Sequence, residues 1–216
     1  MKYPTKSEAA AQIVSYGKRL YDRGYAAAND GNLSVKLSDD TILCTPTGVS
    51  KGCLTPEMLV EMTLDGRVLS QGTLPPSSEV KMHLRVYQEN PAVMAVVHVH
   101  PPVASSFAAA GIALDTPLLT EAIVGLGPVP LAPFALPSTE EVPDSVAPFC
   151  RTHKAVLLSN HGPLTWGSSL EEACFRMEIL EHLATVTMNV CYVMRDTHNK
   201  LSEENIARLK KQFHVE

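Results

Sequence analysis

The chain has 216 residues, of which 45% are hydrophobic and 19% are charged, a composition that allows one globular domain with a substantial buried core. Its formal net charge is -5, from 18 lysines and arginines against 23 aspartates and glutamates, and it has no long basic run. This balance argues against a nucleic-acid or anionic-membrane partner, so we expect a small molecule or another protein.

The first part of the chain predicts a helix, a hairpin, a further strand and a second helix. Apolar residues at helical spacing indicate an amphipathic first helix, with Gly24 near its end. LSVKL and TILCT are short β-like runs joined by a polar turn, and the serines of SSEVKMHLRVYQEN are suited to cap a helix. These elements are expected at residues 7–25 (helix), 33–37 and 41–45 (hairpin), 59–64 (strand) and 77–90 (helix).

The second part of the chain contains two clear apolar strands, AVMAVVHV and AVLLSN. A long stretch with good helix formers follows, with Ser168 or Ser169 as its N-terminal cap. The segment EEVPDSVAPFC is interrupted by prolines, so its helical assignment stays open. We expect strands at residues 92–99, 129–134 and 155–160, and helices at 103–111, 168–193 and 201–213.

Strands and helices alternate without a regular βαβ period. This order predicts an α/β fold, a single three-layer domain over residues 1–216 with a central, mixed and mostly antiparallel sheet flanked by helices. The N-terminus lacks the apolar core of a signal peptide, and no apolar run is long enough for a membrane span, so we expect a cytoplasmic protein.

Several reactive side chains fit structural roles. The cysteines form no CxxC pair, which is typical of reduced core thiols rather than of a disulfide framework or a cysteine zinc site. His83 and His182 fall on predicted helices, where histidines usually serve packing or the surface. The five cysteines are Cys44, Cys53, Cys150, Cys174 and Cys191.

Both apolar strands end in histidines. Side chains alternate along a strand, so His98 and His100 are expected to point to the same side, as two ligands of one metal would. Pro101 and Pro102 cannot continue a ladder, which leaves the pair at a strand end with room for an open coordination position. His161, in SNHG, follows the second strand. Three imidazoles are a ligand set for catalytic zinc, although nickel, manganese, cobalt or iron also suit them, and HxH pairs also occur without metal.

Three loops of small polar residues accompany these histidines. DGNLS (30–34), TPTGVSKG (45–52) and PPSSE (75–79) combine glycine or serine with hydrogen-bond donors that suit an anion. Ser77 and Ser78 fall at the start of a predicted helix, where backbone N–H groups favour phosphate. Each loop alone is equally typical of a capped turn. Together with HVH and NHG they predict a site for a phosphorylated, metal-chelating substrate.

Glu79 comes directly after the two serines. Beside a metal that acidifies the carbon next to a carbonyl group, this carboxylate can act as the proton-transferring base. Alone, it is equally a first-turn glutamate that the helix dipole favours.

The order GNLS, TPTG, PSSE, HVHPP, NHG resembles the zinc-dependent class II aldolase family, typified by L-fuculose-1-phosphate aldolase and including L-ribulose-5-phosphate 4-epimerase. The resemblance runs from the first helix nearly to the C-terminus. It implies a mostly antiparallel sheet flanked by helices and a cyclic homotetramer with active sites between subunits. It also implies His98, His100 and His161 as zinc ligands, Glu79 as the acid/base group that can approach the metal without substrate, and Gly31, Asn32, Thr47, Gly48, Ser77 and Ser78 as phosphate-binding residues.

The activity that this resemblance implies is the reversible cleavage of a ketose 1-phosphate, such as L-fuculose 1-phosphate, to dihydroxyacetone phosphate and an aldehyde. Glu79 would remove a carbon-bound proton while zinc stabilises the enediolate. Epimerases of the family generally carry aspartate where this chain has Glu79, which favours a lyase. The tyrosines that serve the aldehyde side in the fuculose-phosphate aldolase are not evident, because the corresponding stretch reads TPLLTEAIV and the chain ends in FHVE.

Two alternatives remain open at this stage. A sugar-phosphate 4-epimerase or a decarboxylase of a phosphorylated oxo acid would use the same scaffold, since fold does not fix the reaction. A non-catalytic interaction module resembling the adducin head domain is the other. The intact HVH, NHG and Glu79 set argues against the module, because a protein without catalysis has no need of all four residues.

Overall fold

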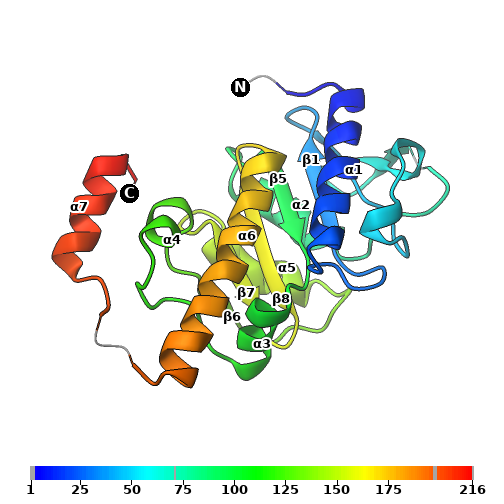
Figure 1. Cartoon of the computed structure of the whole chain (residues 1–216). Helices are drawn as coiled ribbons and strands as arrows, with labels where there is room; N and C mark the ends of the chain where they lie inside the picture. The colour runs from blue at the N-terminus through cyan, green and yellow to red at the C-terminus, as the bar shows by residue number, and fades with distance from the viewer. Residues whose placement is uncertain (1–2, 71, 197–198, 216) are drawn as a thin grey trace.

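The computed structural model describes residues 3–70, 72–196 and 199–215, and its central element is an eight-stranded sheet with helices on both faces (Figure 1). The strands lie in the order β4-β3-β2-β1-β5-β8-β7-β6. Neighbouring strands are antiparallel except for β6 and β7, which are parallel. The predicted α/β class with a mixed, mostly antiparallel sheet is therefore confirmed.

The strands include the predicted hairpin and both apolar strands, but two strands were not predicted. β4 is a three-residue edge strand with every residue exposed, and it is too short to show the alternating pattern of a half-buried strand. β8 begins with Gly-Pro, a pair that is depleted in strand interiors. The bounds are β1 (Asn32–Lys36), β2 (Thr41–Cys44), β3 (Val60–Thr63), β4 (Val68–Ser70), β5 (Ala95–His98), β6 (Leu131–Ala132), β7 (Ala155–Leu158) and β8 (Gly162–Gly167).

The helices also follow their sequence signals. α1 begins with a capping box in which the side chains of Thr5 and Glu8 bond to each other's backbone N–H groups. At α6, Ser169 rather than Ser168 is the cap, and its hydroxyl accepts the N–H of Glu172. The helices are α1 (Lys6–Asp22), α2 (Val80–Glu89), α3 (Pro102–Ala110), α4 (Thr120–Gly125), α5 (Glu141–Val146), α6 (Leu170–Thr187) and α7 (Glu203–Phe213), with 3-10 turns η1 (Lys51–Cys53), η2 (Pro56–Met58) and η3 (Ala147–Phe149) and the π-helical η4 (Met188–Val193).

Strand β5 shows how the two faces of the sheet are filled. Val96 packs with residues of α2 and α5 on one face, whereas Ala95 and Val97 pack with residues of α1 and α6 on the other. All three side chains are fully buried, and burying a valine side chain stabilises the fold by roughly 1.5–3 kcal/mol. Because alternate residues share a face, His98 lies on the same face as Val96 and is directed toward α2.

The strand predicted at residues 92–99 is shorter in the structure, and the strand geometry expected for the HxH pair applies only to His98. β5 ends at His98, so His100 lies beyond the strand, where its N–H donates to the carbonyl of Tyr25 at 2.8 Å. Pro101 is the N-cap of α3 and Pro102 is its first residue. Proline is favoured at the first helical position, so the pair of prolines both ends the strand and begins the next helix.

Two further expectations concern the chain as a whole. Within the residues that the structure describes, no helix is both long enough and apolar enough to cross a membrane. All five cysteines are free thiols, but only Cys44, Cys150 and Cys174 are buried as predicted for core thiols, whereas Cys53 is exposed and Cys191 is half-buried.

Candidate functional site

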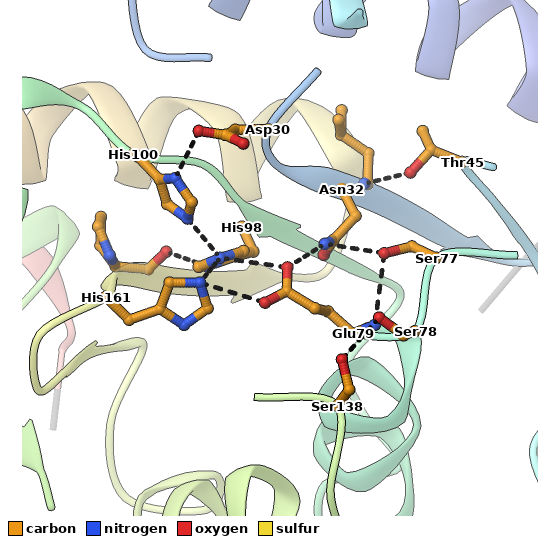
Figure 2. Close-up of polar contacts among 12 residues, drawn as sticks. Asp30, Asn32, Thr45, Ser77, Ser78, Glu79, His98, His100, Ser138 and His161 are labelled. Carbon is orange, nitrogen blue, oxygen red and sulfur yellow. Dashed lines mark hydrogen bonds and ion pairs between the residues drawn. The ribbon is translucent and has the colours of Figure 1, made fainter. Parts of the chain in front are cut away.

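Three histidine side chains converge at the end of β5 (Figure 2). The Nε2 atom of His98 lies 2.9 Å from Nε2 of His100 and 3.3 Å from Nε2 of His161. His161 comes from the turn between β7 and β8, where Asn160 has a φ of +59°. Gly162 is needed beside it, because a Cβ atom there would lie 2.7 Å from the His100 ring.

The hydrogen bonds of His98 and His100 fix which ring nitrogen carries the proton. His98 Nδ1 donates to the carbonyl of Pro163 at 2.9 Å, and His100 Nδ1 donates to the carboxylate of Asp30 at 3.3 Å. Burial lowers the pKa of His98 well below 6.5, and burial followed by the neighbouring His161 lowers the pKa of His100, so both rings are neutral near pH 7. Their Nε2 lone pairs then face each other across 2.9 Å, an arrangement that a cation between them would stabilise.

The spacing of these nitrogens fits a metal ion. Two nitrogens bound at about 2.0–2.1 Å to a tetrahedral zinc are about 3.3–3.4 Å apart, close to the 2.9 and 3.3 Å found around His98. Histidine ligands usually donate their second N–H to a carboxylate or carbonyl, as His98 and His100 do to Pro163 and Asp30. The three-histidine cluster therefore has both the donor set and the outer partners of a transition-metal site.

Glu79 faces the same cluster from the residue immediately before α2. Its Oε1 lies 3.1 Å from Nε2 of His161 and its Oε2 lies 3.7 Å from Nε2 of His98. The side-chain amide of Asn32 donates to Oε2 at 2.9 Å. Burial alone would raise the pKa of Glu79, but the hydrogen bond with His161, the electrostatic effect of His98 and His161 and the bond from Asn32 outweigh it and lower the pKa below 4.5. The carboxylate is therefore ionised at neutral pH, in the form of a base.

A cavity of about 250 Å³ opens beside Glu79 and the histidines. His100 and His161 line it, whereas His98 lies fully buried behind them. All the residues predicted to bind phosphate line this one cavity: Gly31, Asn32, Thr47, Gly48, Ser77 and Ser78. The structure thus gathers the three predicted loops around the histidine cluster.

Local backbone constraints hold the loops in place. Gly31 has a φ of +83°, and a Cβ atom there would lie 2.8 Å from the carbonyl oxygen of His98, so only glycine lets this loop reach the end of β5. Ser77 Oγ accepts the N–H of Glu79 at 3.3 Å, which fixes the start of α2. Thr45 Oγ accepts the N–H of Leu33 at 3.2 Å, which joins two of the loops.

Sequence reasoning assigned no role to three residues at the site. Lys51 is 1% exposed, and its ammonium group donates to the carbonyls of Asn29 (2.9 Å) and Val49 (2.6 Å), which ties two loops together. Burial lowers the pKa of Lys51 to about 8, against the opposing charges of Asp30 and Glu79. Asp30 and Lys51 belong to the loops 30–34 and 45–52, so the sequence offered a reason to consider them. Ser138 lines the cavity from a segment that carries no motif.

Comparisons with known proteins identify the family and the fold of this chain. The family model of the Class II Aldolase and Adducin N-terminal domain matches residues 11–188. The 3-oxo-tetronate 4-phosphate decarboxylase of Pectobacterium atrosepticum is 33% identical, over 95% of this chain and 94% of that protein. The L-fuculose phosphate aldolase of Methanococcus maripaludis is 30% identical, over 86% and 97%. The crystal structure of YgbL from Klebsiella pneumoniae, a candidate aldolase, epimerase or decarboxylase, has a TM-score of 0.88 and 32% identity, over 95% of this chain and 99% of that one.

Proposed function

The chain belongs to the class II aldolase and adducin N-terminal domain family, and we propose that it is a metal-dependent carbon–carbon lyase that decarboxylates a phosphorylated 3-oxo acid such as 3-oxo-tetronate 4-phosphate. One observation carries this proposal. The Glu79 carboxylate lies 3.1 Å from Nε2 of His161, at the edge of the cavity that the three small-residue loops surround. The residues proposed for proton transfer, for metal binding and for anion binding thus lie together.

The chemistry of the two candidate lyase reactions converges. Loss of carbon dioxide from 3-oxo-tetronate 4-phosphate breaks the bond between the carboxyl carbon and its neighbour and leaves the electron pair on the enediolate of dihydroxyacetone phosphate. Cleavage of a ketose 1-phosphate to an aldehyde leaves the same enediolate. Protonation of that carbon then gives dihydroxyacetone phosphate in both cases, so one site suits both reactions.

Different residues of the chain serve metal binding, phosphate binding and proton transfer. A divalent metal held by His98, His100 and His161 would polarise the substrate oxygens as a Lewis acid. Ser77 and Ser78, at the start of α2, bind the phosphate and orient the substrate. Glu79, as a carboxylate, accepts the proton of the hydroxyl group next to the breaking bond and returns it to the carbon, and a proton from water then restores that hydroxyl group. We expect zinc, one ion per subunit, to fill this role best.

The leaving group of each reaction favours the decarboxylase over the aldolase. Carbon dioxide needs no proton donor on the leaving side, whereas an aldehyde is released from an alkoxide that must be stabilised. The resemblance places an aldehyde-side tyrosine in the stretch 116–124. The ionisable side chain of this stretch is Glu121, which is exposed, and Asp115 directly precedes the stretch. Aldol cleavage of a compound such as L-fuculose 1-phosphate remains the second candidate because the aldolase of Methanococcus maripaludis is 30% identical.

We also propose that the protein is a homotetramer, as the family resemblance implies. Tyr192, Val193 and Met194, in and after η4, have 52%, 68% and 71% of their surfaces exposed in the single chain. Adjacent exposed apolar side chains are typical of protein contact surfaces. Light scattering on the purified protein tests this assembly: a monomer would contradict it.

The function is tested by incubating the zinc-loaded protein with 3-oxo-tetronate 4-phosphate and measuring dihydroxyacetone phosphate with a coupled dehydrogenase. A blank without protein corrects for spontaneous decarboxylation, and a chelator-treated sample isolates the metal-dependent rate. L-Fuculose 1-phosphate is assayed in parallel. Product from the oxo acid supports decarboxylation, product from the ketose phosphate alone supports the aldolase, and product from neither with zinc bound refutes the lyase.

A further inference from the structure

The turn between β6 and α5 brings one more hydroxyl group to the cavity. Ser138 lines the cavity together with Thr47 and Ser77, and its Oγ lies 3.0 Å from Oγ of Ser78 (Figure 2). The two serines are sixty residues apart in the chain. The turn therefore completes the side of the cavity where phosphate binding is proposed.

Hydrogen bonds within the turn fix the position of Ser138. The Thr139 hydroxyl donates to the carbonyl of Leu136 at 2.7 Å, and the Glu141 carboxylate accepts the N–H of Leu136 at 3.0 Å. The Glu141 N–H in turn donates to the Thr139 hydroxyl at 3.2 Å. Ser138 is thus held between two residues of a closed hydrogen-bond ring.

The turn is also tied to the helix that carries the other two serines. Lys81 of α2 pairs with Glu140 at 2.7 Å, and Arg85 of α2 pairs with Asp144 of α5 at 2.5 Å. These ion pairs are exposed and individually weak. They join the same two elements that share the buried apolar cluster of α2 and α5, so Ser138 keeps its place relative to Ser78.

The backbone of Ser138 is unusual for a serine. Its φ is +67°, in the left-handed region where glycine and asparagine are preferred. A serine that occupies such a position at the wall of a cavity contributes a hydroxyl group that glycine would lack. Strained residues of this kind cluster at ligand-binding sites.

The absence of positively charged side chains among the described residues of the cavity wall makes the Ser138 hydroxyl relevant to phosphate binding. Among the described residues that line the cavity there is no lysine or arginine. A phosphate group has three peripheral oxygens with several acceptor positions, so neutral N–H and O–H donors must satisfy them here. Each additional donor therefore has a measurable effect on binding.

We propose that Ser138 is a third serine of the phosphate site, and that its hydroxyl donates a hydrogen bond to a phosphoryl oxygen of the substrate. This inference rests on the proposed function, because it assigns a phosphorylated substrate to the same cavity. It adds a recognition residue that comes from the β6–α5 turn rather than from the motif-bearing loops.

The test is a binding titration that needs no turnover. Glycerol 3-phosphate is titrated into the zinc-loaded protein and Kd is measured by NMR shifts, with glycerol as the unphosphorylated control. Ser138→Ala and Ser138→Gly should each raise Kd about 10-fold, the equivalent of about 1.4 kcal/mol. Ser145→Ala, on α5 and away from the cavity, is the matched control and should stay within about twofold of the wild type, since its hydroxyl donates to the carbonyl of Val142 within the helix.

The glycine variant keeps the test decisive. It removes the hydroxyl while suiting the positive φ, so poor folding cannot account for its weaker binding. Unchanged Kd values in both variants, weakening in the alanine variant alone, or no binding of glycerol 3-phosphate to the wild type would each overturn the role of Ser138. Serine-dependent phosphate binding in a protein without lyase activity would refute the proposed reaction and leave this inference standing.

Discussion

Replacing Glu79 by glutamine removes one proton acceptor and changes little else. Glutamine has nearly the same shape as glutamate, and its carbonyl oxygen can still accept the bond that Asn32 donates at 2.9 Å. The amide has no basic oxygen, however, so it cannot take the proton that the proposed mechanism moves. A positioned general base contributes about 100- to 10,000-fold to a rate, which corresponds to about 2.7–5.5 kcal/mol of barrier.

We therefore expect kcat of Glu79→Gln to fall by about 100- to 10,000-fold in the dihydroxyacetone phosphate assay. Zinc content, measured by mass spectrometry of the metal, should stay at one ion per subunit, because the three imidazoles of His98, His100 and His161 are untouched. Glu57→Gln, at an exposed position in η2, is the matched control and should keep full activity. A Glu79→Gln variant with full zinc and more than about a tenth of the wild-type kcat would refute the role of Glu79.

Three further predictions concern the surroundings of the site. Asp30→Asn should weaken zinc affinity about 10- to 100-fold in a chelator competition, because His100 loses the carboxylate that orients it; unchanged affinity would contradict this. Burial lowers the pKa of His83 to about 3, so the unfolded chain binds the extra proton and stability falls as the pH drops from about 6.5 toward 3. In metal-free urea titrations, the wild type should lose about 2–3 kcal/mol more than His83→Asn between pH 7 and 4.5, and equal losses would refute it. Gly31→Ala should lower stability by about 1–3 kcal/mol in urea and reduce zinc binding, since its Cβ meets His98; wild-type values in both would count against that close approach.

Much of the fold was predictable because local patterns agree with it. The hairpin of β1 and β2, the valine-rich β5 and the capped α6 each follow from apolar spacing and turn residues. The sequence does not reveal β8, since Gly162 and Pro163 disfavour a strand. Pairing with β5 and β7 on both sides supplies the stabilisation that local propensity lacks.

The candidate site also contains residues that the sequence predicts and residues that it does not. His98, His100, His161, Glu79 and the small-residue loops were predicted as site residues because each occupies a short motif. The structure places all of them around one cavity except His98, which lies buried behind it. The partners of the histidines were not predictable. Asp30 has an ordinary position in a polar loop, and the carbonyl of Pro163 carries no side-chain signal.

Ser138 is a residue whose place in the site could not be predicted from the sequence. It reaches the cavity through a turn whose shape depends on the Thr139 and Glu141 hydrogen bonds and on the packing of α5 against α2. Such a position is decided by tertiary contacts, so no reading of the neighbouring residues would single it out. The identity of the leaving group is likewise a property of contacts that short motifs do not encode.

The most direct test of metal-dependent enediolate chemistry is proton NMR of dihydroxyacetone phosphate in heavy water. Both lyase reactions pass through the enediolate of this compound, so the measurement requires no knowledge of the leaving group. With the zinc-loaded protein we expect stereospecific loss of one hydroxymethyl proton signal, and no loss after chelation of the metal. A protein that retains zinc and binds the phosphate but leaves both hydroxymethyl protons in place would contradict the proposed mechanism.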